Sequence, residues 1–154
     1  MGQREPLLSI LQSYKRTMKL PGVKIIEPLV IPDPRGVIVK PYVYTDLPVD
    51  FKQAYYAYTS KGDRRGMCYC KADKLVYCTK GKVLDIILDI STGEYMTQEL
   101  SEDNHLAIFI PAGYAHGYQC LEDSCFNYLQ SRVWNPDEEK KVGLDSFGFT
   151  WKEL

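Results

Sequence analysis

From Pro21 onward, closely spaced turn residues divide the chain into short runs of strand-forming residues. Turns that contain glycine are predicted at residues 32–36, 62–66, 80–81 and 92–94. Between two of these turns, aliphatic side chains occupy positions 84, 86, 88 and 90, and acids occupy positions 85 and 89. This alternation is the period-two pattern of a strand with two unlike faces. Roughly ten such runs predict an all-β fold, either a barrel or a jelly roll.

The length and composition indicate one barrel domain with a short extension before it. A chain of 154 residues that is 45% apolar suffices for one sizeable core. Apolar residues recur near helical spacing within residues 4–18, so we expect a short amphipathic helix in an extension of residues 1–20, followed by the barrel at 21–154. Asn135, followed by Pro136 and two acids, is typical of the N-cap and first turn of a short helix.

The charge and hydropathy of the chain exclude several classes of partner. The formal net charge is −1, from 19 basic and 20 acidic residues, which predicts no general attraction to nucleic acid or to a membrane surface. The apolar runs are shorter than the roughly 20 residues needed to span a bilayer. The first residues do not resemble a cleavable signal, so we expect a cytoplasmic protein.

Residues 106–120 contain the most distinctive motif. An apolar run leads into Pro111-Ala112-Gly113, a turn in which proline presets φ and glycine permits a positive φ. The next run carries His116, one of only two histidines in the chain. A Pro-x-Gly-x-x-His turn between two strands resembles the second motif of the cupin barrels.

Other segments make this resemblance more specific. In chain order these are Asp33-Pro34-Arg35-Gly36, Arg65-Gly66, Lys74-Leu75-Val76, Gly81-x-Val83-x-Asp85, Ile110-Pro111-x-Gly113-Tyr114-Ala115-His116-Gly117-Tyr118 and Tyr128. Their order and spacing are similar to those of the dTDP-4-dehydrorhamnose 3,5-epimerase family of cupins. The resemblance covers about residues 21–151 and implies a cupin-type β-barrel.

The resemblance implies a reaction and two catalytic roles. Members of that family epimerise a sugar nucleotide beside a ketone, which requires a base, a cation that holds the enolate, and an acid that returns the proton. By resemblance, Lys74 would hold the enolate oxygen and Tyr128 would return the proton. The implied function is a nucleotide-sugar 3,5-, 3- or 5-epimerase, or a keto-sugar isomerase, in deoxysugar or surface-polysaccharide synthesis.

The resemblance also implies how the substrate is bound. Arg35 and Arg65 would bind the diphosphate, because a planar guanidinium suits bidentate contacts with phosphate. Gln53 stands where the family has a polar nucleotide contact, and Trp134 would stack on the base where the family uses a tyrosine. The family implies a homodimer that needs no cofactor and no metal.

The base of the reaction departs from the family pattern. Cys68 occupies the position of the catalytic histidine, which follows the arginine-glycine pair by two residues. The partner aspartate of that histidine lies beyond the last tryptophan in the family, whereas three residues follow Trp151 here. We therefore expect a single epimerisation or an isomerisation to be as compatible with these residues as the double reaction.

Three residues are candidates to replace the missing base. Cys68 would act as a thiolate if Arg65 or Lys74 lowered its pKa, and Tyr69 and His116 are the rival bases. Asp85 and Asp89 lie on a predicted strand, and we interpret them as structural acids.

Two alternatives to the enzyme remain open. The first is a catalytically impaired cupin that binds a sugar nucleotide without turnover. The second is a metal-binding cupin with Cys68, Cys70, Lys74 and His116 at the ligand positions, although a lysine ammonium would repel a cation.

Overall fold

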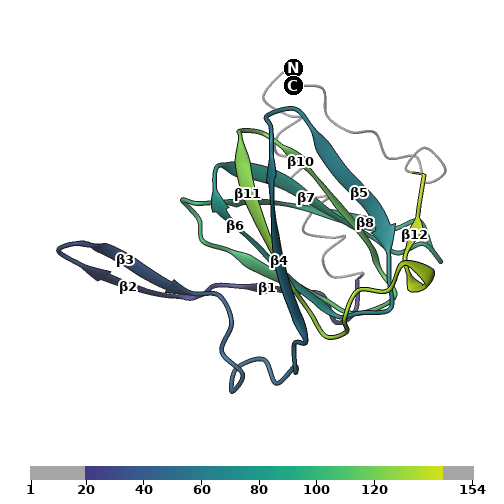
Figure 1. The fold of residues 1–154 in the computed structure, drawn as a ribbon, viewed down its shortest axis with the longest axis horizontal. Coiled ribbons are helices and arrows are strands. Elements are labelled where there is room, and N and C mark those ends of the chain that lie inside the picture. The colour runs from purple at the N-terminus through teal and green to yellow at the C-terminus, as the bar shows by residue number, and fades with distance from the viewer. Residues whose placement is uncertain (1–19, 144–154) are drawn as a thin grey trace.

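The computed structural model describes residues 20–143, which form two five-stranded antiparallel sheets and a separate hairpin (Figure 1). The first sheet has the order β1 (Lys24–Ile26), β9 (Ala107–Ile110), β6 (Lys74–Lys80), β11 (Ser124–Gln130) and β4 (Gln53–Thr59). The second has the order β12 (Lys140–Lys141), β5 (Arg64–Tyr69), β10 (Ala115–Cys120), β7 (Lys82–Leu88) and β8 (Tyr95–Ser101). The hairpin consists of β2 (Leu29–Asp33) and β3 (Gly36–Lys40), and a 3₁₀ turn, η1 (Pro136–Glu138), precedes β12.

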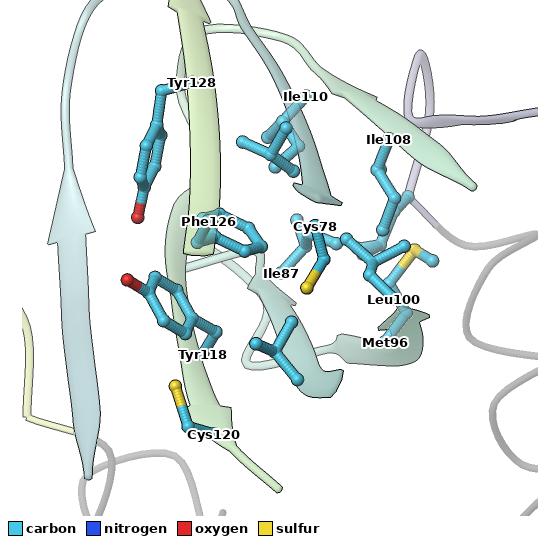
Figure 2. Packing of buried hydrophobic residues seen from close by; sticks show 13 residues of the cluster. Cys78, Ile87, Met96, Leu100, Ile108, Ile110, Tyr118, Cys120, Phe126 and Tyr128 are labelled. Carbon is cyan, nitrogen blue, oxygen red and sulfur yellow. The ribbon is translucent and has the colours of Figure 1, made fainter. Parts of the chain in front are cut away.

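The main core lies between the two sheets. Its buried side chains come from both sheets and include Val76, Ile108, Phe126, Ile87, Met96 and Leu100 (Figure 2). On β7, Val83 and Ile87 belong to this core, whereas Ile86 and Leu88 pack on the outer face in a second cluster. The predicted alternation in residues 82–90 is confirmed, and Asp85 shares the face of Val83 and Ile87, which is the interior face.

The all-β barrel or jelly roll predicted from the sequence is confirmed. The predicted helical turn is also confirmed: the Asn135 side chain accepts a hydrogen bond of 3.0 Å from the backbone N–H of Asp137, at the start of η1. The predicted N-terminal helix lies outside the described residues, and the domain division at residue 20 stays a prediction. Within residues 20–143, no helix combines the length and apolar character required to cross a membrane.

The β2–β3 hairpin projects away from the two sheets (Figure 1). Five of its aliphatic side chains are 39–57% exposed, namely Leu29, Val30, Ile31, Val37 and Ile38. In the described part of the chain, β2 and β3 pair only with each other, and the register divides these five side chains between the two faces of the hairpin. Exposed apolar side chains gathered on one element are typical of a site that contacts another protein surface.

We expect Gly81→Ala to destabilise the barrel. Gly81 joins β6 to β7 with a φ of +76°, and a Cβ there would lie 2.2 Å from the carbonyl oxygen of Asp123. A left-handed conformation costs a residue with a side chain about 1–3 kcal/mol, and the backbone contact adds to that. Chemical denaturation should show a lower free energy of unfolding.

Gly62→Ala is the matched control for this change. Gly62 has a φ of +86°, but a Cβ added there would meet no atom of the described residues within 4 Å. Its free energy of unfolding should therefore fall by less than that of Gly81→Ala, and equal losses would contradict the role assigned to the Asp123 contact.

Candidate active site

Strands of both sheets place polar side chains on the interior face of the barrel. Paired strand positions share a face, and the register pairs Tyr128 with Tyr55, and His116 with Cys68. The polar positions on this face, from β4 to β11, are Gln53, Tyr55, Arg65, Cys68, Lys74, Asp85, His116, Tyr118, Tyr128 and Gln130. The fold therefore brings most of the predicted site residues together on one surface.

A buried pair of side chains, His116 and Asp85, lies at the centre of this surface. The Nε2 atom of His116 is 2.5 Å from Oδ1 of Asp85, and both side chains are almost completely buried. Burial raises the pKa of Asp85, while the charges of His116 and Lys74 act in the opposite direction. Among the described residues, the second carboxylate oxygen of Asp85 has no hydrogen-bond partner. Asp85 thus holds the His116 ring in place inside the barrel, as a structural acid would.

Tyr128 is held by aromatic contacts beside this pair. Its ring stacks on Tyr55 at a centroid distance of 4.4 Å and meets the His116 ring edge-on at 5.9 Å. Burial raises the pKa of Tyr128 well above its ordinary value, so the phenol keeps its proton at neutral pH. A protonated phenol in a fixed orientation is suited to act as a general acid.

A chain of hydroxyl groups connects Tyr128 to the rim of the barrel. The hydroxyl groups of Tyr118 and Tyr128 point toward each other (Figure 2). The Tyr118 hydroxyl is also 3.3 Å from Oγ1 of Thr59, which accepts a hydrogen bond of 2.9 Å from Nε of Arg65. No sequence motif predicts a role for the hydroxyl groups of Tyr118 and Thr59, because they lie on different sheets and meet only in the folded barrel.

The surroundings of Cys68 differ from those predicted. A cation close to it is Lys141 on β12, whose Nζ lies 3.2 Å from the Cys68 sulfur. Burial raises the pKa of the Cys68 thiol, and Lys141 only partly opposes this effect. The expectation that Arg65 or Lys74 lowers this pKa was wrong, because desolvation of the half-buried thiol outweighs the nearby positive charge.

Tyr69, the neighbouring candidate base, does not face the site. Its ring packs on the outer face of the second sheet against the cluster that contains Met67 and Leu88. The side chains of β5 alternate between the two faces, so Cys68 and Tyr69 point in opposite directions.

A cleft at the mouth of the barrel brings Gln53 and Trp134 together. The backbone N–H of Trp134 donates a hydrogen bond of 2.8 Å to Oε1 of Gln53, and its indole N–H donates one of 2.7 Å to Oε2 of Glu139. The Tyr55 hydroxyl donates to Oε1 of Gln130, which also lines this cleft. The hydrogen bond from the indole N–H to Glu139 holds the Trp134 ring, which remains half exposed.

Arg35, which was predicted to bind the diphosphate, lies apart from this surface. It lies in the turn of the β2–β3 hairpin, its side chain is 88% exposed, and its guanidinium pairs with Asp33 at 3.1 Å. The hairpin projects from the barrel, so Arg35 lies apart from the interior side chains of its own chain (Figure 1).

The four positions considered as metal ligands combine side chains that can bind a metal ion with one cation that repels it. Lys74, at one of them, is a buried cation on β6. Across residues 20–143, no group of three or more histidine, cysteine or acidic side chains is arranged to hold a metal ion.

Comparisons with known proteins agree on one family. A family model described as dTDP-4-dehydrorhamnose 3,5-epimerase matches residues 17–154. The dTDP-4-dehydrorhamnose 3,5-epimerase of Escherichia coli K12 is 32% identical over 137 residues, which cover 79% of this chain and 74% of that protein. The enzyme of the same name from Methanothermobacter thermautotrophicus is 30% identical over 148 residues, 86% of this chain and 80% of its own.

The solved structures extend this agreement to the fold. The dTDP-6-deoxy-D-glucose-3,5-epimerase of Legionella pneumophila, in complex with dTDP-4-keto-L-rhamnose, superposes with a TM-score of 0.79 at 28% identity. The match covers 86% of this chain and 79% of that one. An epimerase from Mycobacterium tuberculosis superposes with a TM-score of 0.81 at 25% identity, over 86% and 75% of the two chains.

We expect Cys68 to react slowly with iodoacetamide at pH 7, because its raised pKa leaves little thiolate. Lys141→Met should slow the reaction further, since it removes the cation that lowers this pKa. The rate should rise with pH in both proteins. The alkylation rate of Cys68 would be measured by tandem mass spectrometry that distinguishes Cys68 from Cys70.

Lys140→Met is the matched control for the alkylation experiment. Lys140 pairs with Tyr69 in the register of β12, and its neighbour Lys141 pairs with Cys68. Its removal should leave the rate at Cys68 unchanged within about twofold. Reaction at pH 7 faster than that of a free cysteine would contradict the raised pKa.

Proposed function

The chain belongs to the dTDP-4-dehydrorhamnose 3,5-epimerase family, and we propose that it epimerises a dTDP-4-keto-6-deoxyhexose-type sugar nucleotide at C3, at C5 or at both. The observation that carries this proposal is the placement of Lys74 and Tyr128 on the same interior face of neighbouring strands β6 and β11. We place this reaction in the cytoplasm, in deoxysugar or surface-polysaccharide synthesis.

The proposed reaction uses the two residues in separate steps. Removal of the proton next to the ketone leaves an enolate, whose oxygen the buried Lys74 ammonium stabilises. Tyr128 then donates its phenolic proton to the carbon, and the raised pKa of Tyr128 keeps that proton available at neutral pH. The Asp85–His116 pair orients the ring against which Tyr128 packs.

The nucleotide would bind at the mouth of the barrel. The half-exposed Trp134 ring offers a face for stacking on the base, and Gln53 holds the backbone of Trp134 in place. Arg65 bonds through its Nε to Thr59, at the end of β4 opposite Gln53, and the two terminal nitrogens of its guanidinium suit bidentate contacts with the diphosphate.

The deuterium content of the sugar tests this function. Incubation with dTDP-4-keto-6-deoxyglucose in deuterated water should place deuterium at C3 or C5, as observed by NMR. Tyr128→Phe should lower turnover by about 10²- to 10⁴-fold, because the phenolic proton is missing, and should leave nucleotide binding within a few-fold.

Asn127→Asp is the matched control on the same strand, because Asn127 lies on the outer face and bonds to Thr79. It should retain turnover. Binding of the sugar nucleotide without any exchange in the unaltered protein would contradict the enzyme and favour the sugar-nucleotide-binding cupin.

We also propose that the protein is a homodimer formed through the β2–β3 hairpin. The exposed aliphatic side chains of this hairpin would be buried against a second copy of the chain. Association would carry the exposed Arg35 away from its own barrel and toward the partner, where its guanidinium could join the diphosphate contacts.

Ile38→Asp should dissociate the dimer, because it buries a charge in the apolar contact. Sedimentation velocity should show a species of about twice the 17.7 kDa chain for the unaltered protein and a monomer for the variant. Ile90→Asp, at another partly exposed aliphatic position, is the control and should remain dimeric. A monomeric unaltered protein would contradict the proposal.

A further inference from the structure

The segment after η1 returns to the barrel and places Glu139 at the mouth of the site. Glu139 ends the 3₁₀ turn, and the two residues of β12 that follow pair with β5, Lys140 with Tyr69 and Lys141 with Cys68. The Glu139 side chain lines the same cleft as Cys70 and Gln130. A carboxylate is therefore positioned next to the residue that replaces the family's histidine.

One donor orients this carboxylate. The indole N–H of Trp134 donates a hydrogen bond of 2.7 Å to its Oε2 atom. The negative charge of Glu139 contributes to raising the pKa of the Cys68 thiol, after the larger effect of burial. Lys141 lies 3.2 Å from the same sulfur, so the thiol is flanked by a cation and an anion.

The other groups near this position are poorly suited to accept a proton from the sugar. The Cys68 thiol has a raised pKa and so holds its proton at neutral pH. The Nε2 atom of His116 is engaged with Asp85, and Tyr69 packs on the outer face. An ionised carboxylate has only acceptor atoms, and Glu139 has lone pairs beyond the one that the Trp134 donor uses.

We propose that Glu139 is the general base of the epimerisation, with Trp134 as the residue that positions its carboxylate. This assignment rests on the proposed function. One Glu139 oxygen takes the proton from the carbon beside the ketone, and the electrons of that C–H bond form the enolate, whose oxygen contacts Lys74. Tyr128 then gives its proton to the carbon, and water restores the ionised carboxylate and the neutral phenol.

Glu139→Gln tests this assignment, because glutamine keeps an oxygen for the Trp134 donor but cannot take up the proton. Deuterium incorporation from solvent should fall by about 10²- to 10⁴-fold. The KM for the sugar nucleotide and the affinity for dTDP should stay within about threefold of the unaltered protein, since only a proton-accepting group is lost. Calorimetric binding of dTDP shows whether the variant is folded.

Glu138→Gln is the matched control, because Glu138 precedes Glu139 and pairs with Arg132 at 2.9 Å. It should retain exchange within about twofold, as expected for an exposed ion pair. If Glu139→Gln fails to bind dTDP, the same measurement is made with Glu139→Ala. Deuterium exchange by either folded variant at the rate of the unaltered protein would overturn the assignment.

The outcomes separate this assignment from the proposed function. Exchange by the unaltered protein together with full exchange by Glu139→Gln would overturn the role of Glu139 and leave the epimerase intact. No exchange by the unaltered protein would overturn both.

Discussion

The contact between Asp85 and His116 is the interaction on which the interior of this barrel depends. An ionised carboxylate inside an apolar barrel is costly unless a charged or hydrogen-bonding partner lies beside it. Here β7 supplies the carboxylate between two aliphatic residues, and the neighbouring strand β10 supplies the imidazole, with Lys74 contributing a further positive charge. The pair therefore makes it possible to bury polar groups in a core that is otherwise aliphatic and aromatic, and it fixes the ring that Tyr128 meets edge-on.

The elements that the sequence predicts well are those determined by residues close to one another along the chain. The alternation in residues 82–90 follows from the two-residue period of a strand, and the Asn135 cap follows from a bond between residues two positions apart. The Pro111–Gly113 turn and His116 are likewise identified by a contiguous motif. The alternation does not show which face is the interior, because the outer face of β7 is also buried under Met67.

The features that the sequence did not predict depend on contacts between distant residues. The pKa of Cys68 is determined by burial and by Lys141, which is 73 positions away. A two-residue strand such as β12 has no recognisable periodicity, so neither Lys141 nor Glu139 could be placed in the site. The motif predicts Arg35 at the diphosphate, but Arg35 lies in the turn of a hairpin that projects from the barrel, and no local pattern predicts where such a hairpin points.

The residues of the proposed reaction lie on structural elements that differ in how firmly they are held. Lys74 and Tyr128 lie on β6 and β11, adjacent strands in the middle of a five-stranded sheet, where pairing on both sides restricts movement. Glu139 lies between a single 3₁₀ turn and a two-residue strand at the edge of the other sheet. Elements with so few backbone hydrogen bonds open more readily than central strands. The proposed acid and enolate-binding cation therefore lie on central strands, whereas the proposed base lies on an edge segment with few backbone hydrogen bonds.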